Sequence, residues 1–385
     1  MIEFTSKLPH VGTTIFTTMS ALAAETAAVN LGQGFPDFEC DPRLLEMMNR
    51  AMAAGHNQYP QMTGVPELRE QIAAKVQECY GRAYGVANEI TVTAGATQAI
   101  QTALTAIVHP GDEVIVLEPV YDSYEPVIRM NGGKARASKL VFPDYRPNWD
   151  EIRALIGPRT RAIMINTPHN PTATVWSRDD FDTLAALIRN TNMLVISDEV
   201  YEHMVFDGCA HASVSSHPEL AERAFVISSF GKTYHVTGWK IAYCLAPKAL
   251  MAEFRKAHQF VVFTVHTPSQ HAIAEYMSLG THRDLSAFYQ AKRDFFLRQV
   301  ATTPLRWKPS CGTYFVLAEY GHLSEHAHKS ETQFADWLTR KIGVACIPVS
   351  AFYADGEDHR IVRFCFAKRE ETLTRAAERL AKLQH

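Results

Sequence analysis

The 385-residue sequence lacks the features that mark several classes of protein. Its seven cysteines are scattered, with no C-x-x-C pair and no clustered Cys/His spacing. This spread argues against a disulfide framework and against a metal site, and it favours free thiols. The formal net charge is -3, from 38 basic and 41 acidic residues, and no basic block stands out. Nucleic acid and anionic membranes are therefore poor candidate partners.

Long apolar runs and two common signals are missing as well. No stretch approaches the length of a membrane span, and residues 1–7 lack the basic start and apolar core of a signal peptide. Together with the free thiols, these absences favour a cytoplasmic protein. No G-x-G-x-x-G follows the first expected strand of the sheet, which disfavours a simple NAD-binding protein.

The patterning that is present indicates an α/β fold with a second, smaller part. Strand-like and helix-like segments alternate from about residue 88 to 262, and the strands are continuous apolar runs such as 114–117. This pattern predicts a mostly parallel sheet covered by helices on both faces. The last third, with a long amphipathic segment at 285–300 and short strands at 314–317 and 361–366, predicts a smaller α+β part. The first forty residues read as loop-rich, and we expect them to cross back onto that part.

Lys232 is the most informative single residue. It follows an apolar run at 224–228 and lies in a segment with hydroxyls, glycines and a second lysine, Lys240. An amine in this position can bond to an aldehyde cofactor, and Ser229 and Lys240 can hold the phosphate of that cofactor. Most lysines are solvated surface groups, so this hypothesis depends on the residues at the ends of the other strands.

Two of the other strand ends suggest contacts to a phosphorylated ring. An open α/β sheet binds ligands outside the carboxyl ends of its strands. The small residues Gly95, Ala96 and Thr97 follow the strand expected at 89–93 and open a helix, where backbone N–H groups can approach a phosphate. Tyr121 follows the next strand and can stack on a ring, although a tyrosine there is more often plain packing.

Two further strand ends supply polar groups. Asn166 and Asn170 lie in a rigid turn, where an amide can donate to a ring hydroxyl, although Asn-Pro is also common in simple turns. Asp198 follows the strand at 193–197 and can pair with a pyridinium nitrogen, or alternatively cap a helix. Together with Lys232, these residues are the parts of a pyridoxal phosphate site.

Six short motifs connect these residues to a known family. They are N-L-G-Q-G-F-P-D-F at 30–38, N-Q-Y at 57–59, N-T-P-H-N-P at 166–171, S-D-E-V-Y at 197–201, the lysine segment at 228–240 and V-R-F-C-F at 362–366. Over nearly its whole length the chain resembles the fold-type I, pyridoxal-phosphate-dependent aminotransferases of class I and II. It is most similar to bacterial methionine aminotransferases and to the kynurenine and glutamine aminotransferases. The resemblance implies a large domain with a mostly parallel seven-stranded sheet at 43–282, and a small α+β domain made of 1–42 and 283–385.

The resemblance also implies a role for each candidate residue. Lys232 would bond to the cofactor and then move the substrate proton, Asp198 would pair with the ring nitrogen, and Tyr201 would bond the ring phenolate oxygen. Further cofactor contacts would come from Gly95, Ala96, Thr97, Tyr121, Asn170, Ser229 and Lys240. The substrate would contact Arg363, Asn166, Gly34 and Phe16. Tyr59 would reach the cofactor phosphate of a partner subunit, which implies a homodimer with shared active sites.

The activity implied is a ping-pong transfer of an amino group to a 2-oxo acid. We expect methionine as donor, and also aromatic amino acids, glutamine or kynurenine, because no second arginine for a dicarboxylate side chain is apparent. Two reactions on the same scaffold remain open, a cysteine-conjugate C–S β-lyase and a cyclopropane-forming synthase, because both begin with the same proton removal. A regulator that uses the fold as a sensor would carry a DNA-binding domain in front, for which the sequence leaves no room.

Overall fold

A seven-stranded sheet organises the larger part of the chain in the computed structural model, which describes residues 5–383. Its strand order is β2-β8-β7-β6-β5-β3-β4. The strands are β2 (Ile90–Thr93), β3 (Glu113–Glu118), β4 (Lys134–Lys139), β5 (Thr160–Asn166), β6 (Leu194–Asp198), β7 (Ala224–Ser229) and β8 (Ala242–Leu245). Strand β8 runs antiparallel to both of its neighbours, and the other pairs are parallel. The predicted α/β fold with a mostly parallel seven-stranded sheet is confirmed.

Apolar side chains cover both faces of this sheet, as continuous apolar strands predict. Strand β3 shows the alternation: Val114 and Val116 belong to the core on one face, and Ile115 and Leu117 belong to the core on the other. The first core includes residues of α4 (Ala96–Ile107), α5 (Tyr124–Met130) and α10 (Lys248–Val261). The second includes residues of α2 (Pro42–Ala53), α3 (Pro66–Tyr80), α6 (Trp149–Leu155), α7 (Arg178–Ile188), the short α8 (Pro218–Ala221) and α11 (Thr267–Met277).

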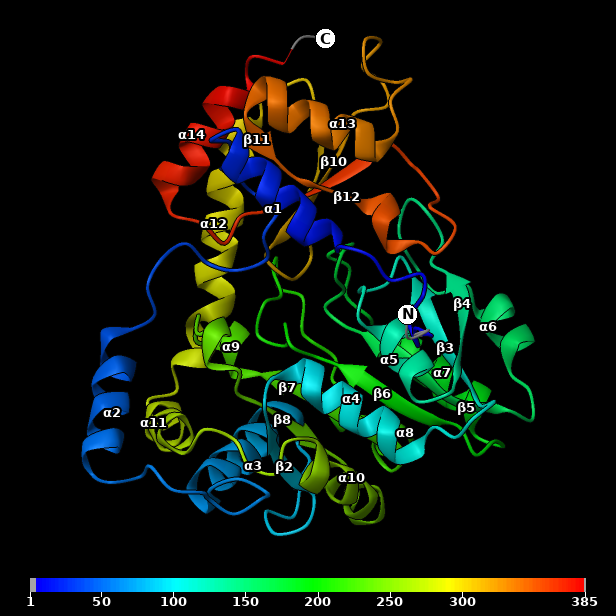
Figure 1. Ribbon diagram of the computed structural model, residues 1–385, viewed down its shortest axis with the longest axis vertical. Coiled ribbons are helices and arrows are strands. Elements are labelled where there is room, and N and C mark those ends of the chain that lie inside the picture. Colours follow the sequence, from blue (N-terminus) through cyan, green and yellow to red (C-terminus); the bar gives the residue numbers. More distant parts are fainter. Residues whose placement is uncertain (1–4, 384–385) are drawn as a thin grey trace, which may run out of the picture.

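A second group of elements packs above the carboxyl ends of the parallel strands (Figure 1). It contains an antiparallel sheet of order β12-β13-β10-β9 and a parallel pair, β1 and β11. The strands are β1 (Val29–Asn30), β9 (Arg306–Lys308), β10 (Phe315–Glu319), β11 (Val344–Ala345), β12 (Ile347–Pro348) and β13 (Ile361–Cys365). The helices are α1 (Ile15–Glu25), α12 (Leu285–Val300), α13 (Glu331–Trp337) and α14 (Glu370–Leu380).

The N-terminal segment differs from the prediction in one respect. Residues 15–25 form the helix α1 instead of a loop, because Met19 and Leu22 pack into the same core as residues of α12, α13 and α14. Strand β1 then pairs with β11 near the other end of the chain. The exact domain boundaries, at 42/43 and 282/283, stay a prediction.

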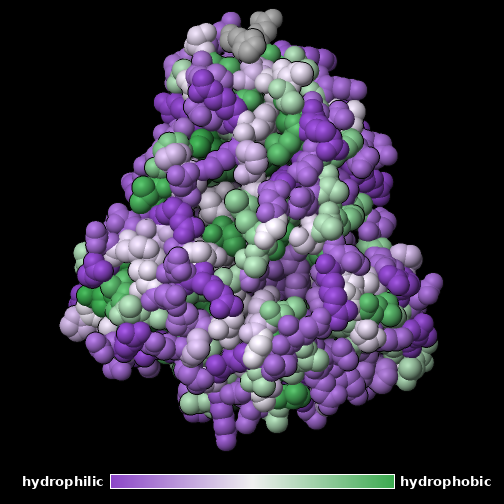
Figure 2. Space-filling view, turned by 180° about the vertical axis from the view of Figure 1, so that it is seen from behind, coloured by the Kyte–Doolittle hydropathy of each residue, from purple (hydrophilic) through white to green (hydrophobic). Residues whose placement is uncertain are grey.

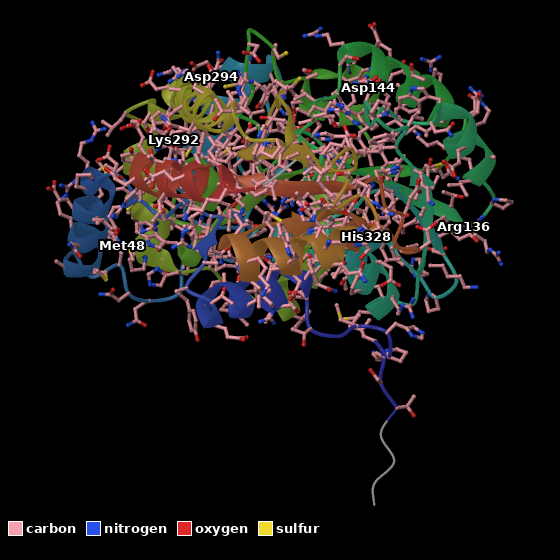
Figure 3. The ribbon with its side chains drawn as sticks, turned by 90° about the horizontal axis from the view of Figure 1, so that it is seen from above. Met48, Arg136, Asp144, Lys292, Asp294 and His328 are labelled. Atoms are coloured by element: carbon pink, nitrogen blue, oxygen red, sulfur yellow. The ribbon has the colours of Figure 1, made fainter. Side chains whose placement is uncertain are left out.

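The surface adds two observations. It is mainly hydrophilic, with small separate apolar patches on the face seen in Figure 2. Seen from above, the chain ahead of α1 leads away from the body of the molecule (Figure 3), and residues 5–7 and 9–14 are exposed. Within residues 5–383, no helix combines the length and the apolar character that crossing a membrane requires.

Candidate active site

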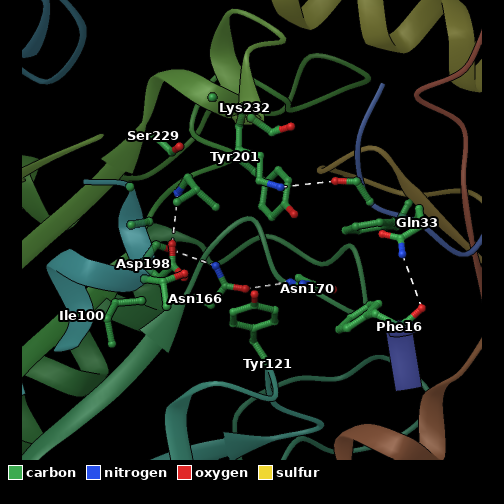
Figure 4. Close-up of a pocket in the computed structure, with 18 of the residues that line it drawn as sticks. Phe16, Gln33, Ile100, Tyr121, Asn166, Asn170, Asp198, Tyr201, Ser229 and Lys232 are labelled. Atoms are coloured by element: carbon green, nitrogen blue, oxygen red, sulfur yellow. Dashed lines mark hydrogen bonds between the residues drawn. The ribbon is translucent and has the colours of Figure 1, made fainter. Parts of the chain in front are cut away.

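A cavity of about 320 Å³ lies where the carboxyl ends of β5, β6 and β7 meet the start of α4 (Figure 4). It contains every site residue predicted from the sequence except Tyr59. The lining residues are Phe16, Gln33, Gly34, Gly95, Ala96, Thr97, Ile100, Tyr121, Asn166, Asn170, Asp198, Val200, Tyr201, Ser229, Gly231, Lys232, Thr237, Lys240, Phe315 and Arg363. Side chains that are far apart in the sequence therefore meet at the edge of the sheet where ligands are expected.

Lys232 lies in the short helix α9 (Phe230–Thr233), directly after β7. Its Nζ donates to the hydroxyl of Tyr314 at 2.9 Å and to the carbonyl of Gly34 at 3.3 Å. Burial lowers the pKa of Lys232 to about 8, because a charged ammonium is poorly solvated there. A neutral amine is thus available close to neutral pH.

Asp198 ends β6 and lies on the floor of the cavity. Burial raises its pKa to about 6, since the ionised form loses water, while hydrogen bonds to the carboxylate oppose the shift. Those bonds come from the Tyr124 hydroxyl, 2.6 Å from Oδ2, and from the Val200 backbone N–H, 3.3 Å from Oδ1. A pKa of about 6 keeps the carboxylate ionised at neutral pH.

Arg363 points from β13 into the cavity and is only 1% exposed. Its guanidinium carbon lies 3.8 Å from the ring centroid of Phe315, its Nη1 donates to Oδ1 of Asn170, and its Nη2 donates to the carbonyl of Gly32 at 3.2 Å. Among residues 5–383, Nε of Arg363 has no hydrogen-bond partner although it is buried. A buried guanidinium with a free donor is suited to a carboxylate ligand.

The two asparagines form a short chain of hydrogen bonds beside this guanidinium. Asn166 donates from Nδ2 to the carbonyl of Asp198 at 2.8 Å, and its Oδ1 accepts from the backbone N–H of Asn170 at 2.8 Å. Both amides are buried. The polar turn predicted at 166–171 is therefore fixed between the backbone carbonyl of Asp198 and the guanidinium of Arg363.

Gly95 and Lys240 approach each other closely at the opposite end of the cavity. Gly95 has φ +82°, in the left-handed region that favours glycine, and it immediately precedes α4. A Cβ atom at this position would lie 3.0 Å from Nζ of Lys240. The N-terminus of α4, the Lys240 ammonium and Ser229 all line the cavity, an arrangement that suits an anion.

Tyr59 lies outside the cavity, with 80% of its surface exposed. Its ring makes an edge contact with Phe263, at 5.4 Å between centroids. Phe260 nearby in the chain is 89% exposed. Tyr59 and Phe263 thus form an exposed aromatic pair, and Phe260 is a further exposed aromatic side chain.

Several residues of the site were missed by the sequence reasoning. Thr237 lies within the lysine segment and could have been included from that motif alone. Phe315 and Tyr314 lie in or beside a predicted strand, but nothing in the local sequence pointed to the cavity. Tyr124 is the first residue of α5, three residues after Tyr121, and it contacts Asp198 because of how α5 packs. The other lining residues that were missed are Gln33, Ile100, Val200 and Gly231.

Comparison with known proteins gives consistent results. The family model for aminotransferase class I and II matches residues 26–380. The chain is 49% identical over 380 residues to methionine aminotransferase of Escherichia coli, covering 98% of each chain, and 40% identical to a probable N-succinyldiaminopimelate aminotransferase of Mycobacterium tuberculosis, again covering 98% of each. Human kynurenine–oxoglutarate transaminase 1 is 34% identical, with 94% of this chain and 93% of the relative covered. The crystal structure of YbdL from Escherichia coli, described with a methionine aminotransferase function, has a TM-score of 0.96 at 48% identity and full coverage of both chains.

Proposed function

The chain belongs to the class I and II aminotransferases, and from this premise we propose that it transfers the amino group of methionine to a 2-oxo acid. Aromatic amino acids, glutamine and kynurenine are proposed as further donors. The enzyme is a transaminase that depends on pyridoxal phosphate. One observation carries the proposal: a single cavity holds the amine of Lys232, the carboxylate of Asp198 and the guanidinium of Arg363.

The residues of the cavity fit pyridoxal phosphate at both of its ends. The anion-binding end at Gly95, Ser229 and Lys240 suits the phosphate, and Gly95 keeps this end open because a Cβ atom there would crowd Lys240. The carboxylate of Asp198 suits a protonated ring nitrogen. Tyr121 lines the same cavity and would lie against the ring, while Ala96 and Thr97 would contribute backbone N–H groups.

Pyridoxal phosphate, when bound, supplies the electron sink on which transamination depends. Lys232 would accept the proton that leaves the substrate Cα, since its lowered pKa provides a free amine, and would then pass that proton to the cofactor. Asp198 stays ionised near neutral pH and so offers a negative charge to the ring nitrogen. Tyr201 and Asn170 line the cavity between these groups and would hydrogen-bond the ring phenolate oxygen.

The substrate carboxylate would bind Arg363 and Asn166. Arg363 has a free Nε and is held rigidly by Phe315, Asn170 and Gly32, so that little side-chain freedom is lost when a carboxylate binds. Arg363 is also the only arginine among the described residues that line the cavity. A donor with a second carboxylate would therefore lack a guanidinium partner on this chain.

The apolar part of the cavity supports an uncharged donor side chain such as that of methionine. Phe16, Val200 and Phe315 line it. Gly34 approaches this surface so closely that a Cβ atom there would lie 2.9 Å from Cζ of Phe315. A thioether packs well on aromatic rings, which favours methionine over polar donors.

A homodimer with shared active sites is part of the proposal. Tyr59, Phe260 and Phe263 are exposed aromatic side chains of the kind that protein interfaces bury. The exposed chain ahead of α1 leads away from the body (Figure 3), and we propose that it packs against a second copy of the chain. Light scattering on the purified protein tests the assembly, and Tyr59→Phe would then weaken cofactor binding without changing the assembly.

A cytoplasmic location is proposed on the state of the thiols. All seven cysteines are free. Free, partly exposed thiols such as Cys79, Cys209 and Cys311 persist in reducing compartments. Cell fractionation with antibody detection tests this location.

The deciding experiment is a half-reaction with methionine and no acceptor. The visible absorption of the enzyme loaded with pyridoxal phosphate is recorded before and after addition of methionine. We expect stoichiometric conversion to the pyridoxamine form and release of the 2-oxo acid. An unchanged spectrum would overturn methionine as a donor, and pyruvate with ammonia from a cysteine conjugate would point to the β-lyase instead.

A further inference from the structure

We propose that Tyr314 is a positioning residue for the reaction, whose hydroxyl holds the ε-amino group of Lys232 so that the nitrogen lone pair faces the cavity. The proposal deepens the function proposed above and rests on it for the role of Lys232. Tyr314 does not line the cavity; it lies directly behind the lysine, at the start of β10.

Three atoms define the arrangement. Nζ of Lys232 donates to Oη of Tyr314 at 2.9 Å and to the carbonyl oxygen of Gly34 at 3.3 Å, and Oη of Tyr314 donates its own proton to the same carbonyl. A phenol has one proton to donate, and Gly34 takes it. Only a lone pair of Oη is therefore left to face the lysine.

This arrangement fixes the direction of the free amine. A neutral amine has two N–H bonds and one lone pair. Because Oη of Tyr314 is itself hydrogen-bonded to the carbonyl of Gly34, both acceptors lie on one side of Nζ and take N–H from it, which turns the lone pair of Lys232 away from that side, toward the cavity that Nζ borders. That is the orientation a base needs to take a proton from a bound substrate, and the proton moves to Nζ while Tyr314 keeps its own.

The packing around Tyr314 prevents its ring from turning away. The residue is fully buried, and its ring contacts those of Tyr201, Tyr289 and Phe315, with centroids 5.2, 5.7 and 4.9 Å away. Burial raises the pKa of Tyr314 well above its ordinary value, and the neighbouring Tyr201 adds to the shift. The phenol thus stays protonated and serves as an acceptor for the lysine, never as a competing base.

The same short segment contacts both basic side chains of the site, Lys232 and Arg363. Gly34 accepts from Lys232 and Tyr314, and the carbonyl of Gly32, two residues earlier, accepts from Arg363. Removing the phenol hydroxyl takes away a partner of Lys232 and leaves the bonds of Arg363 in place. The effect of the change should therefore fall on kcat and spare the binding of the substrate carboxylate.

The test compares Tyr314→Phe with Tyr289→Phe. Tyr289 is a matched control, because it is also fully buried and packs on Tyr314, yet its hydroxyl has no partner among residues 5–383. We expect Tyr314→Phe to lower kcat with methionine about 10- to 100-fold, with KM changed by less than about threefold, because oriented proton transfer is typically worth this much or more. Tyr289→Phe should stay within about twofold of the native enzyme in both constants.

A second readout does not depend on turnover. The rate at which the cofactor-free protein captures pyridoxal phosphate is measured against pH, since capture requires the neutral amine of Lys232. Oη accepts a hydrogen bond from the amine, and an acceptor favours the charged form, so Tyr314→Phe should move the midpoint down by about 0.5–1 pH unit. Tyr289→Phe should leave the midpoint unchanged.

The outcomes separate the possible explanations. A native kcat, or a native capture midpoint in Tyr314→Phe, would overturn the proposal, as would equal changes in the two variants. If Tyr314→Phe does not fold, 3,5-difluorotyrosine at position 314 keeps the packing and weakens the acceptor, and the midpoint should again move down. If the native enzyme fails to convert methionine but the midpoint still moves, the proposed donor is wrong and the role of Tyr314 stands.

Discussion

Two buried lysines, Lys232 and Lys75, have opposite surroundings. Lys75, on α3, donates to Glu202 at 2.7 Å and to Tyr243 at 2.5 Å, and the side chains of Lys75 and Glu202 are 5% and 4% exposed. Lys232 borders an open cavity, and its hydrogen-bond acceptors within residues 5–383 are both neutral, Tyr314 and Gly34. A buried charge that is fully paired fixes structure, whereas an unpaired amine beside a cavity is available for chemistry.

The carboxylates near the two lysines, Glu202 near Lys75 and Asp198 near Lys232, show the same contrast. Glu202 accepts from Lys75, Tyr80, Tyr243 and Ser228. Burial alone would raise its pKa, but the charge of Lys75 and these hydrogen bonds hold it well below its ordinary value. Asp198, with one phenol donor and one backbone donor, keeps a raised pKa of about 6.

The ion pair between Lys75 and Glu202 also supports the residues of the cavity. Glu202 directly follows Tyr201 in the chain, and Ser228, which donates to Glu202, directly precedes Ser229. The ion pair therefore ties together α3, the end of β6 and the two antiparallel strands β7 and β8. This hydrogen-bonded network fixes the neighbouring Tyr201 and Ser229, which line the cavity.

The largest expected effect comes from Lys232→Met. Turnover of methionine should fall about 10⁴-fold or more, because both the cofactor bond and the proton transfer need the amine. Steady-state kinetics with methionine and a 2-oxo acid measure the loss. Lys240→Met, which removes a cation from the other end of the cavity, is the matched control and should mainly weaken cofactor binding. Activity within about tenfold of native would contradict the role of Lys232.

Lys75→Met should act on stability instead. It leaves Glu202 as an unpaired buried charge, which costs about 3–5 kcal/mol of unfolding free energy. Urea denaturation measures this loss. The protein that remains folded should keep kcat within about threefold of native, and adding Glu202→Gln should restore part of the stability. A large fall in kcat without a loss of unfolding free energy would contradict a purely structural role for Lys75.

The lowered pKa of Lys232 should make the stability of the cofactor-free protein depend on pH. The pKa of Lys232 is about 8 in the folded protein, below the ordinary value of 10.5, so the unfolded chain binds more protons between these pH values. Cofactor-free Lys232→Met should therefore be more stable than native by about 1–3 kcal/mol at pH 7, and this advantage should shrink as pH rises from 8 to 10.5. Denaturation at pH 7 and pH 10 measures both values; an advantage that grew with pH would contradict the assigned shift.

The smallest expected effects come from removing one phenol on each side. Tyr124→Phe takes the main side-chain donor from Asp198, so the pKa of Asp198 should rise above about 6 and the acid limb of kcat/KM should move to higher pH. Tyr243→Phe should lower the free energy of unfolding by about 1–2 kcal/mol and leave that limb unchanged, because Glu202 keeps three other donors. Equal shifts of the acid limb in the two variants would contradict the assignment of that limb to Asp198.

Much of the fold and site could be predicted from local sequence. Continuous apolar strands predicted the buried parallel sheet, and the rule that ligands bind at the carboxyl ends of strands placed Asp198, Asn170 and Lys232 in one site from the sequence alone. These signals work because each residue follows directly after its own strand. The position of Arg363 in the cavity came from the resemblance to a family, since it lies in the second group of elements.

Other features could not be predicted, because long-range packing creates them. Tyr314 is 82 residues from Lys232 in the chain, and no local pattern distinguishes it from a core tyrosine. The first forty residues were predicted as loop-rich, and the helix α1 within them was not predicted; its sequence, IFTTMSALAAE, is rich in threonine and alanine and has weak apolar periodicity. Met19 and Leu22 favour the helix only once the core of α12–α14 is present.

The connection between β7 and the antiparallel strand β8 spans only residues 230–241, and it carries both Lys232 and Lys240. The proposed covalent and ionic anchors of the cofactor therefore cannot move apart when other parts of the molecule shift. Arg363 belongs to a different sheet, so the substrate is held across two groups of elements. On the proposed function, the covalent anchor of the cofactor lies on one short connection, whereas each substrate is held between that connection and Arg363 on the other sheet, so that substrates can come and go while the cofactor stays bound.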